Sequence, residues 1–170
     1  MYEHKQLFDS SLDRIREVGG ENGLKLPQAF ARWFADMYFE QPRDFFPADG
    51  PGDAKVDLFF NTSNGKEVTH HVLNTKFTEK YNSIAPVAFY NEVTAFWQAF
   101  KNKSNRSNYL SAIPRHELRP HYAKLFDHFD EGRAHLYFLT NHKRNERQFE
   151  AVRNYEVEVF HLEGECPTLC

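Results

Sequence analysis

The stretch KVDLFFNTSNGKEVTHHVLNTKF, residues 55–77, predicts two β-strands joined by a tight turn. Asn64 and Gly65 supply the turn, because both residue types tolerate the positive φ angles that a type I′ hairpin requires. On either side of this turn, apolar and polar residues alternate in the way that is typical of a strand with two different faces. The stretch therefore predicts a β-hairpin at the centre of the fold.

Three polar residues of this hairpin can meet on one face of the sheet. Side chains along a strand point alternately to its two faces, so Asn74 and Lys76 share a face of the second strand. By the same rule Asp57 points away from the apolar residues that flank it in the first strand. We expect a carboxylate, a carboxamide and an ammonium group to converge there.

Length and composition favour one soluble domain with an ordinary core. The chain has 170 residues, of which 41% are hydrophobic and 26% are charged, and its net charge is −3. A nucleic-acid surface would therefore be a local basic patch. The two cysteines, Cys166 and Cys170, make no disulfide framework, and no apolar run is long enough to span a membrane. We expect a cytoplasmic protein without membrane contact.

The remaining chain predicts helices on both sides of the hairpin, then two further strands. Apolar spacing, proline starts and glycine stops indicate helices over 2–18, 27–39, 86–101 and from about 119 to 132. Strands are expected over 134–140 and 155–162, with a short helix over about 145–153 between them. This strand–helix–strand unit suggests a parallel crossover. Loops are expected over 41–55, which is rich in Pro, Gly and Asp, and over 102–108.

This order of elements resembles the restriction-endonuclease-like (PD-(D/E)XK) fold, an α/β fold in which helices flank a mixed central sheet. The chain is most similar to the N-terminal nuclease-like domain of AIPR (abortive infection phage resistance) proteins and to Mrr-like restriction domains. In these families a Gly/Asp-rich loop leads to an Asp on a strand, and the next strand carries Gln-x-Lys and an aromatic residue. The residues that match are Gly50, Gly52, Asp53 and Asp57, then Asn74-Thr75-Lys76-Phe77, and later Thr140-Asn141.

The resemblance spans roughly residues 27–162 and implies a single domain over 1–170, with an additional N-terminal helix over 1–20. The chain is compatible with being the N-terminal part of a longer protein that carries C-terminal domains. One departure stands out: Asn74 occupies the position where the family has Glu or Gln. Asn offers the same amide as Gln one methylene shorter, which bears on metal binding more than on the fold.

The implied function is metal-dependent hydrolysis of DNA phosphodiesters, by an endonuclease or by the nuclease-like module of a bacterial phage-defence protein. The catalytic residues would be Asp57, Asn74 and Lys76. Mg²⁺ or Mn²⁺ would be held by Asp57, the Asn74 amide and the Thr75 carbonyl, and Lys76 would orient water or stabilise transition-state charge. A nuclease that cuts both strands would often be a homodimer. The supporting acid stays open among Asp36, Glu40, Asp49 and Asp53.

Three other interpretations stay open. Asp57 and Lys76 would form an ordinary cross-strand ion pair, worth under about 1 kcal/mol. Alternatively, Asn74 marks a catalytically degenerate domain that binds nucleic acid or a protein partner without cleaving. Finally, the domain would be an interaction module of a larger chain if the face of Asp57 and Lys76 were packed against protein.

Two basic sets are candidates for binding phosphates, and a solvated loop is the alternative for each. They are Lys101, Lys103 and Arg106, and Lys143, Arg144 and Arg147.

The histidines are weaker candidates. His70 and His71 are adjacent on a strand and face opposite ways, so they cannot chelate one ion together. His70 shares the face of Asn74 and Lys76 as a minor candidate, with a structural role as the alternative. A zinc site of His161, Cys166 and Cys170 lacks a fourth ligand nearby.

Overall fold

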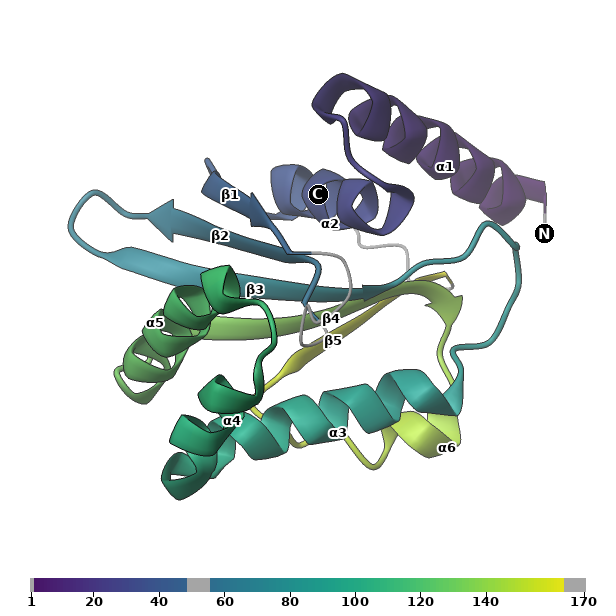
Figure 1. Ribbon diagram of the computed structural model, residues 1–170. Helices are drawn as coiled ribbons and strands as arrows, with labels where there is room; N and C mark the ends of the chain where they lie inside the picture. Colours follow the sequence, from purple (N-terminus) through teal and green to yellow (C-terminus); the bar gives the residue numbers. More distant parts are fainter. Residues whose placement is uncertain (1, 49–55, 164–170) are drawn as a thin grey trace.

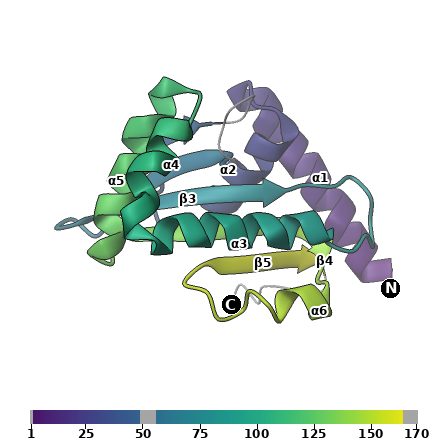
Figure 2. The ribbon, with the colours of Figure 1, turned by 60° about the horizontal axis from the view of Figure 1, so that its bottom comes forward.

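The computed structural model describes residues 2–48 and 56–163. Five strands form one mixed sheet in the order β1-β2-β3-β4-β5, and helices cover both of its faces (Figures 1 and 2). The strands are β1 (Arg43–Pro47), β2 (Leu58–Ser63), β3 (Val68–Lys76), β4 (Ala134–Lys143) and β5 (Glu158–Glu163). The helices are α1 (Tyr2–Asn22), α2 (Leu26–Tyr38), α3 (Val87–Lys101), η1 (Lys103–Asn105), α4 (Arg106–Ala112), η2 (His116–Leu118), α5 (Arg119–Asp130) and α6 (Glu146–Phe149).

The sheet changes from antiparallel to parallel at β3. β1 pairs with β2 and β2 with β3 in antiparallel fashion, whereas β3–β4 and β4–β5 are parallel. Parallel neighbours need a crossover, and α3 to α5 supply it between β3 and β4, while α6 supplies it between β4 and β5. The predicted α/β class, the mixed sheet flanked by helices, the central hairpin and the final parallel crossover are confirmed.

The hairpin turn differs from the type I′ prediction. Ser63 pairs with Val68, so four residues, 64–67, form the connection. Gly65 has a φ of 87°, but Asn64 is not among the residues with positive φ. Instead, the Asn64 side-chain oxygen accepts hydrogen bonds from the backbone N–H groups of Lys66 (3.0 Å) and Glu67 (2.9 Å). A short polar side chain that caps its own turn explains why this longer loop forms.

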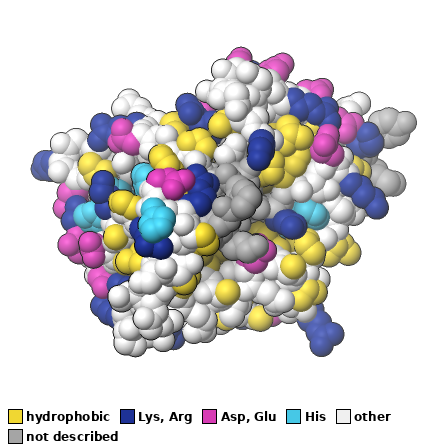
Figure 3. Space-filling model, in the orientation of Figure 1, with side chains coloured by type: hydrophobic (Ala, Val, Ile, Leu, Met, Phe, Trp, Pro, Cys, Tyr) yellow, Lys and Arg dark blue, Asp and Glu magenta, His cyan; other side chains and the backbone are white. Residues whose placement is uncertain are grey.

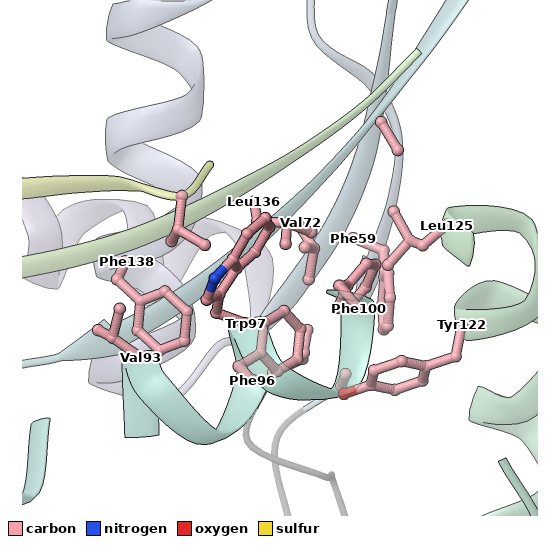
Figure 4. Packing of buried hydrophobic residues seen from close by; sticks show 14 of the residues in the cluster. Phe59, Val72, Val93, Phe96, Trp97, Phe100, Tyr122, Leu125, Leu136 and Phe138 are labelled. Carbon is pink, nitrogen blue, oxygen red and sulfur yellow. The ribbon is translucent and has the colours of Figure 1, made fainter. Parts of the chain in front are cut away.

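Two apolar cores lie on the two faces of the sheet. On the first face, α3 and α5 pack against β2, β3 and β4, and Figure 4 shows Phe96 and Phe100 of α3 beneath the sheet residues Phe59 and Phe138. On the second face, α2 covers the other side chains of the same strands. The buried members there include Phe30, Phe34, Leu58, Phe60, Leu73, Tyr137 and Leu139. Strict alternation along β2, β3 and β4 builds both cores.

α1 extends past the glycines at which it was expected to stop. The helix continues through Gly19 and Gly20 and ends at Asn22, directly before Gly23, whose φ is 65°. A Cβ at Gly19 would lie 3.1 Å from the Leu24 carbonyl oxygen and 3.3 Å from the Ala29 Cβ. Gly19 therefore allows the close approach of α1 and α2, and this packing outweighs the low helix propensity of glycine.

Both predicted loops contain regular structure within the described residues. Residues 41–55 were expected to be a loop, yet 43–47 form edge strand β1, with a bulge and a φ of 55° at Asp44. The segment 102–108 was also expected to be a loop, but it forms η1 and the start of α4. The reason is Arg106, which binds the carbonyl oxygens of Phe100 and Phe126 and so fixes this helix to its neighbours.

The C-terminal elements are shorter than expected, because α6 is a single turn and β5 begins at Glu158. None of the helices in the described residues has the length and apolar character needed to cross a bilayer.

Candidate functional site

The predicted catalytic residues lie at one end of the central strands, where β2 begins and the parallel strands β3 and β4 end. Lys76 pairs with Thr140 in the β3–β4 register. Asp57 directly precedes β2, and its backbone N–H donates to the Leu73 carbonyl oxygen at 3.0 Å. We call Asp57, residues 74–76 and residues 140–143 the site edge.

The carboxylate of Asp57 is held by Thr75. Its Oδ2 accepts a hydrogen bond from the Thr75 backbone N–H at 2.6 Å and another from the Thr75 hydroxyl at 2.8 Å. Thr75 Oγ1 also lies 3.4 Å from the Pro27 carbonyl oxygen in α2. Only 9% of Asp57 is exposed. The side chain thus joins the start of β2 to the end of β3.

Asn74 and Lys76 differ in their access to solvent. Asn74 is buried, with 4% of its surface exposed, whereas Lys76 is half-buried. Across residues 2–48 and 56–163, no carboxylate lies within ion-pair distance of the Lys76 ammonium. The cross-strand ion pair between Asp57 and Lys76, which was an alternative explanation of the motif, is therefore not formed.

The described residues offer few acidic ligands for a Mg²⁺ or Mn²⁺ ion. No group of three or more His, Cys, Asp or Glu side chains in this part of the chain is arranged to hold a metal ion. Mg²⁺ prefers anionic oxygen ligands, but Asp57 Oδ2 already accepts two hydrogen bonds from protein donors. Asp36 forms an ion pair with Arg32 at 2.9 Å on α2. Glu40 is exposed, and Asp49 and Asp53, like Gly50 and Gly52, lie outside the described residues.

A buried hydrogen-bond network at the end of β4 was not predicted. The Thr140 hydroxyl donates to the Lys76 carbonyl oxygen at 2.7 Å and accepts from the His142 backbone N–H at 3.1 Å. The His142 Nδ1 lies 2.7 Å from the same hydroxyl. Burial lowers the pKa of His142; a hydrogen bond with the Lys76 backbone partly offsets this effect, and the Lys76 charge adds to it. The sequence does contain an indication of this network, because polar residues directly follow the apolar run of β4.

A second unpredicted network joins α3 to β5. Tyr90 Oη lies 2.8 Å from His161 Nε2 and accepts a hydrogen bond from the Asn145 backbone N–H at 2.9 Å. Burial, followed by the charges of Arg144 and His142, lowers the pKa of His161 to about 4. His161 thus has a structural role in the described residues, and the cysteines of the proposed zinc site, Cys166 and Cys170, lie outside them.

The second basic set flanks the site edge, but its three members differ in availability. Lys143 is the last residue of β4 and is half-buried. The Arg144 guanidinium lies 4.3 Å from the centre of the Phe149 ring, which gives it a packing role. Arg147 in α6 is exposed. Lys143 therefore adds positive charge to the site edge, and Arg147 adds an exposed positive charge on α6, the element that follows β4.

The first basic set lies at the opposite end of the sheet. α3 runs back along the sheet from the site edge, so Lys101 and Lys103 are beside α4 and α5 (Figures 1 and 2). Lys103 pairs with Asp130 at 3.1 Å, and only 12% of the Arg106 side chain is exposed. Arg106 is therefore a structural residue, and this set does not extend the site edge.

Charges of both signs are interspersed on the face shown in Figure 3. This agrees with the slightly negative net charge of the chain.

Comparison with known proteins adds no relative: no protein-family model, no curated protein and no solved structure matches this chain.

Proposed function

We propose that this chain is a DNA-binding domain of the restriction-endonuclease-like type that contacts phosphates at the site edge without cleaving them. The observation that carries the proposal is the contrast between Asp57 and Lys76. The carboxylate is bound by protein donors, whereas the ammonium at the same edge has no acidic partner in the described residues.

Cleavage would require a metal ion at this edge, since the transferring phosphoryl group and the leaving oxygen both need their charge stabilised. The Oδ2 atom of Asp57 accepts two hydrogen bonds from Thr75, and Asn74 is uncharged and buried. The two hydrogen bonds, at 2.6 and 2.8 Å, fix the orientation of the Asp57 carboxylate toward Thr75. This arrangement supports a role of Asp57 in holding the strands together.

Binding of a phosphate backbone needs cations on a rigid support, and here Lys76 and Lys143 are half-buried while Arg147 is exposed. Lys76, Lys143 and Arg147 come from the ends of β3 and β4 and from α6, and the strands themselves are fixed by the Thr140 network. Each phosphate contact with duplex DNA contributes about −0.9 to the slope of log K against log salt. Three contacts thus predict a slope of about −2.7, and weak, sequence-independent affinity, with a Kd on the order of 10⁻⁴–10⁻⁶ M at physiological salt.

The test is fluorescence anisotropy with labelled duplex DNA over a series of salt concentrations. Lys76→Gln should weaken binding and bring the slope about 0.9 closer to zero. Lys66→Gln is the matched control, because Lys66 is exposed on the same hairpin at the opposite end of the sheet. Equal losses from both variants would contradict a site at this edge, as would an absence of binding by the wild-type protein.

Metal-dependent cleavage is the second candidate, and one observation favours it: Asp57 and Lys76 do lie at the same end of the hairpin, as the motif requires. Plasmid and single-stranded DNA are incubated with Mg²⁺ or Mn²⁺, and with EDTA as a control. Our proposal expects intact DNA under all conditions. Cleavage that needs metal and disappears in Asp57→Ala and Lys76→Ala would replace the proposal with an active endonuclease.

A further inference from the structure

The connection between β3 and α3, residues 77–86, is fixed against the end of β4 (Figure 1). The Asn141 side chain accepts a hydrogen bond from the Thr78 backbone N–H at 2.8 Å and donates one to the Thr78 carbonyl oxygen at 2.6 Å. Further along the connection, the Lys143 backbone N–H donates to the Ser83 carbonyl oxygen at 2.8 Å. The connection is therefore a rigid extension of the sheet beside the site edge.

Two apolar side chains on this extension are exposed to solvent. Ile84 is 63% exposed, and Val87, the first residue of α3, is 48% exposed. Ile84 forms a parallel bridge with Lys143, and the Ala85 backbone N–H donates to the Lys143 carbonyl oxygen at 2.9 Å. Paired residues of neighbouring strands, which lie about 4.8 Å apart, point their side chains to the same face. We call Ile84 and Val87 the exposed apolar pair, and it lies directly beside a lysine of the site edge.

The charge around the exposed apolar pair is mostly positive. The basic residues of segments 76–87 and 140–147 are Lys76, Lys80, Lys143, Arg144 and Arg147, and the acidic ones are Glu79 and Glu146. Glu79 is paired with Arg16 of α1 at 2.6 Å, which offsets its charge. This surface therefore suits a ligand that carries both negative charge and apolar groups.

We propose that the exposed apolar pair contacts unpaired bases, so that the domain prefers single-stranded DNA to duplex DNA; this inference rests on the proposed binding of DNA phosphates at the site edge. In a duplex the bases are paired and stacked, and apolar side chains reach them only in a groove or by opening a base step. In a single strand the faces of the bases are free to pack on protein side chains while the backbone follows the cations. Ile84 and Val87 thus contact bases, and Lys143 contacts a neighbouring phosphate.

A base contact and a phosphate contact differ in their dependence on salt. Each phosphate contact with a single strand contributes about −0.7 to the slope of log K against log salt, whereas packing of a base on an apolar side chain releases no counterion. Lys143→Gln should therefore bring the slope for single-stranded DNA about 0.7 closer to zero. Ile84→Ser should weaken binding of the single strand at every salt concentration and leave this slope unchanged.

The test is fluorescence anisotropy over a series of salt concentrations with one labelled oligonucleotide, used alone and annealed to its complement. The wild-type protein should bind the single strand at least about fivefold more tightly than the duplex. Ile84→Ser and Val87→Ser should each weaken binding of the single strand by about fivefold and leave binding of the duplex unchanged.

Met37→Ser is the matched control, because Met37 is an apolar residue of α2 that is 49% exposed. It lies away from the site edge, since α2 begins beside Thr75 and ends beside His71. Circular dichroism and the urea midpoint of each variant show whether the fold is retained. If Ile84→Ser does not fold, Val87→Ser decides the question.

The failure of this inference can be distinguished from the failure of the proposed function. An absence of binding to either DNA refutes both, whereas equal binding of single-stranded and duplex DNA by the wild-type protein overturns this inference alone. It is also overturned if folded Ile84→Ser and Val87→Ser keep the preference for the single strand, or if Met37→Ser causes the same loss. Sedimentation with vesicles of phosphatidylserine and phosphatidylcholine tests the competing ligand. Binding to vesicles that depends on Ile84, without a preference for single strands, would assign the pair to an anionic membrane surface.

Discussion

Acidification from pH 7.5 to pH 5 should destabilise the folded chain mainly through two buried histidines, His71 and His161. Only 4% of His71 and 1% of His161 is exposed. Burial, followed by the neighbouring His135 and His70, lowers the pKa of His71 to about 3. Burial likewise lowers the pKa of His161 to about 4. In the unfolded chain both imidazoles return to a pKa of 6.5.

The sign follows from the proton balance of the two states. Between pH 6.5 and the folded-state pKa, the two histidines bind protons in the unfolded chain but not in the folded chain. The free energy of unfolding therefore falls as the pH falls. At pH 5 each histidine lies about 1.5 pH units below its unfolded pKa, and each therefore costs about 2 kcal/mol. Together they remove about 4 kcal/mol, a large share of the roughly 5–15 kcal/mol that stabilises an ordinary domain.

The assay is urea unfolding followed by tryptophan fluorescence and far-ultraviolet circular dichroism at several pH values from 7.5 to 5. His71→Phe separates the contribution of this histidine from general acid effects. The new ring keeps the stack on Phe60, whose centre lies 4.8 Å from that of His71. It loses the 2.7 Å hydrogen bond to Thr62, which is half-exposed and can bind water instead.

At pH 7.5 His71→Phe should change stability by no more than about 1 kcal/mol, the usual net value of one hydrogen bond. At pH 5 it should be about 2 kcal/mol less acid-sensitive than the wild type. His116→Asn, at an exposed position, should leave the pH dependence unchanged. The reasoning would be refuted by parallel pH profiles for His71→Phe and the wild type, because the acid sensitivity would then arise elsewhere.

Three stability predictions concern other parts of the fold, each measured by urea unfolding at pH 7.5. Asp57→Asn should cost about 1–3 kcal/mol, since charge-assisted bonds to Thr75 become neutral ones; an unchanged midpoint would mean that Asp57 does not join the strands. Arg106→Ala should cost about 1–3 kcal/mol through two buried carbonyl groups that lose their donor, and a neutral effect would contradict its anchoring role. Gly19→Ala should destabilise by about 1–2 kcal/mol through its contacts with α2. Gly20→Ala, where a Cβ meets nothing within 4 Å, should stabilise by about 0.5–1 kcal/mol; equal effects of the two would refute the close-approach argument.

The sequence predicted the elements whose apolar pattern agrees with their burial. α3 was expected over 86–101 and spans Val87–Lys101, because its wide apolar stripe packs against the sheet. The continuous apolar run 134–140 lies within β4, which is buried on both faces between parallel neighbours. In these segments local propensity and tertiary packing favour the same structure, so periodicity alone suffices.

The predictions that failed depended on contacts that no local pattern reveals. β1 lies in a segment rich in proline and glycine and forms because β2 offers it a pairing edge. α4 is held through Arg106, whose partners Phe100 and Phe126 come from other helices. The hydrogen bonds from Thr75 to Asp57 likewise come from a neighbouring strand, and alternation along one strand does not reveal them.

The change from antiparallel to parallel pairing at β3 also bears on the order in which the strands pair during folding. β3 meets β2 across the connection 64–67, but it meets β4 only after residues 77–133 have been brought round. Loop-closure entropy makes the second encounter more costly by about 2 kcal/mol. We therefore expect the hairpin to form first and the docking of β4 onto it to limit the folding rate. Substitutions in β4 should therefore act on the refolding rate more strongly than substitutions in β1, an edge strand that joins a sheet already assembled.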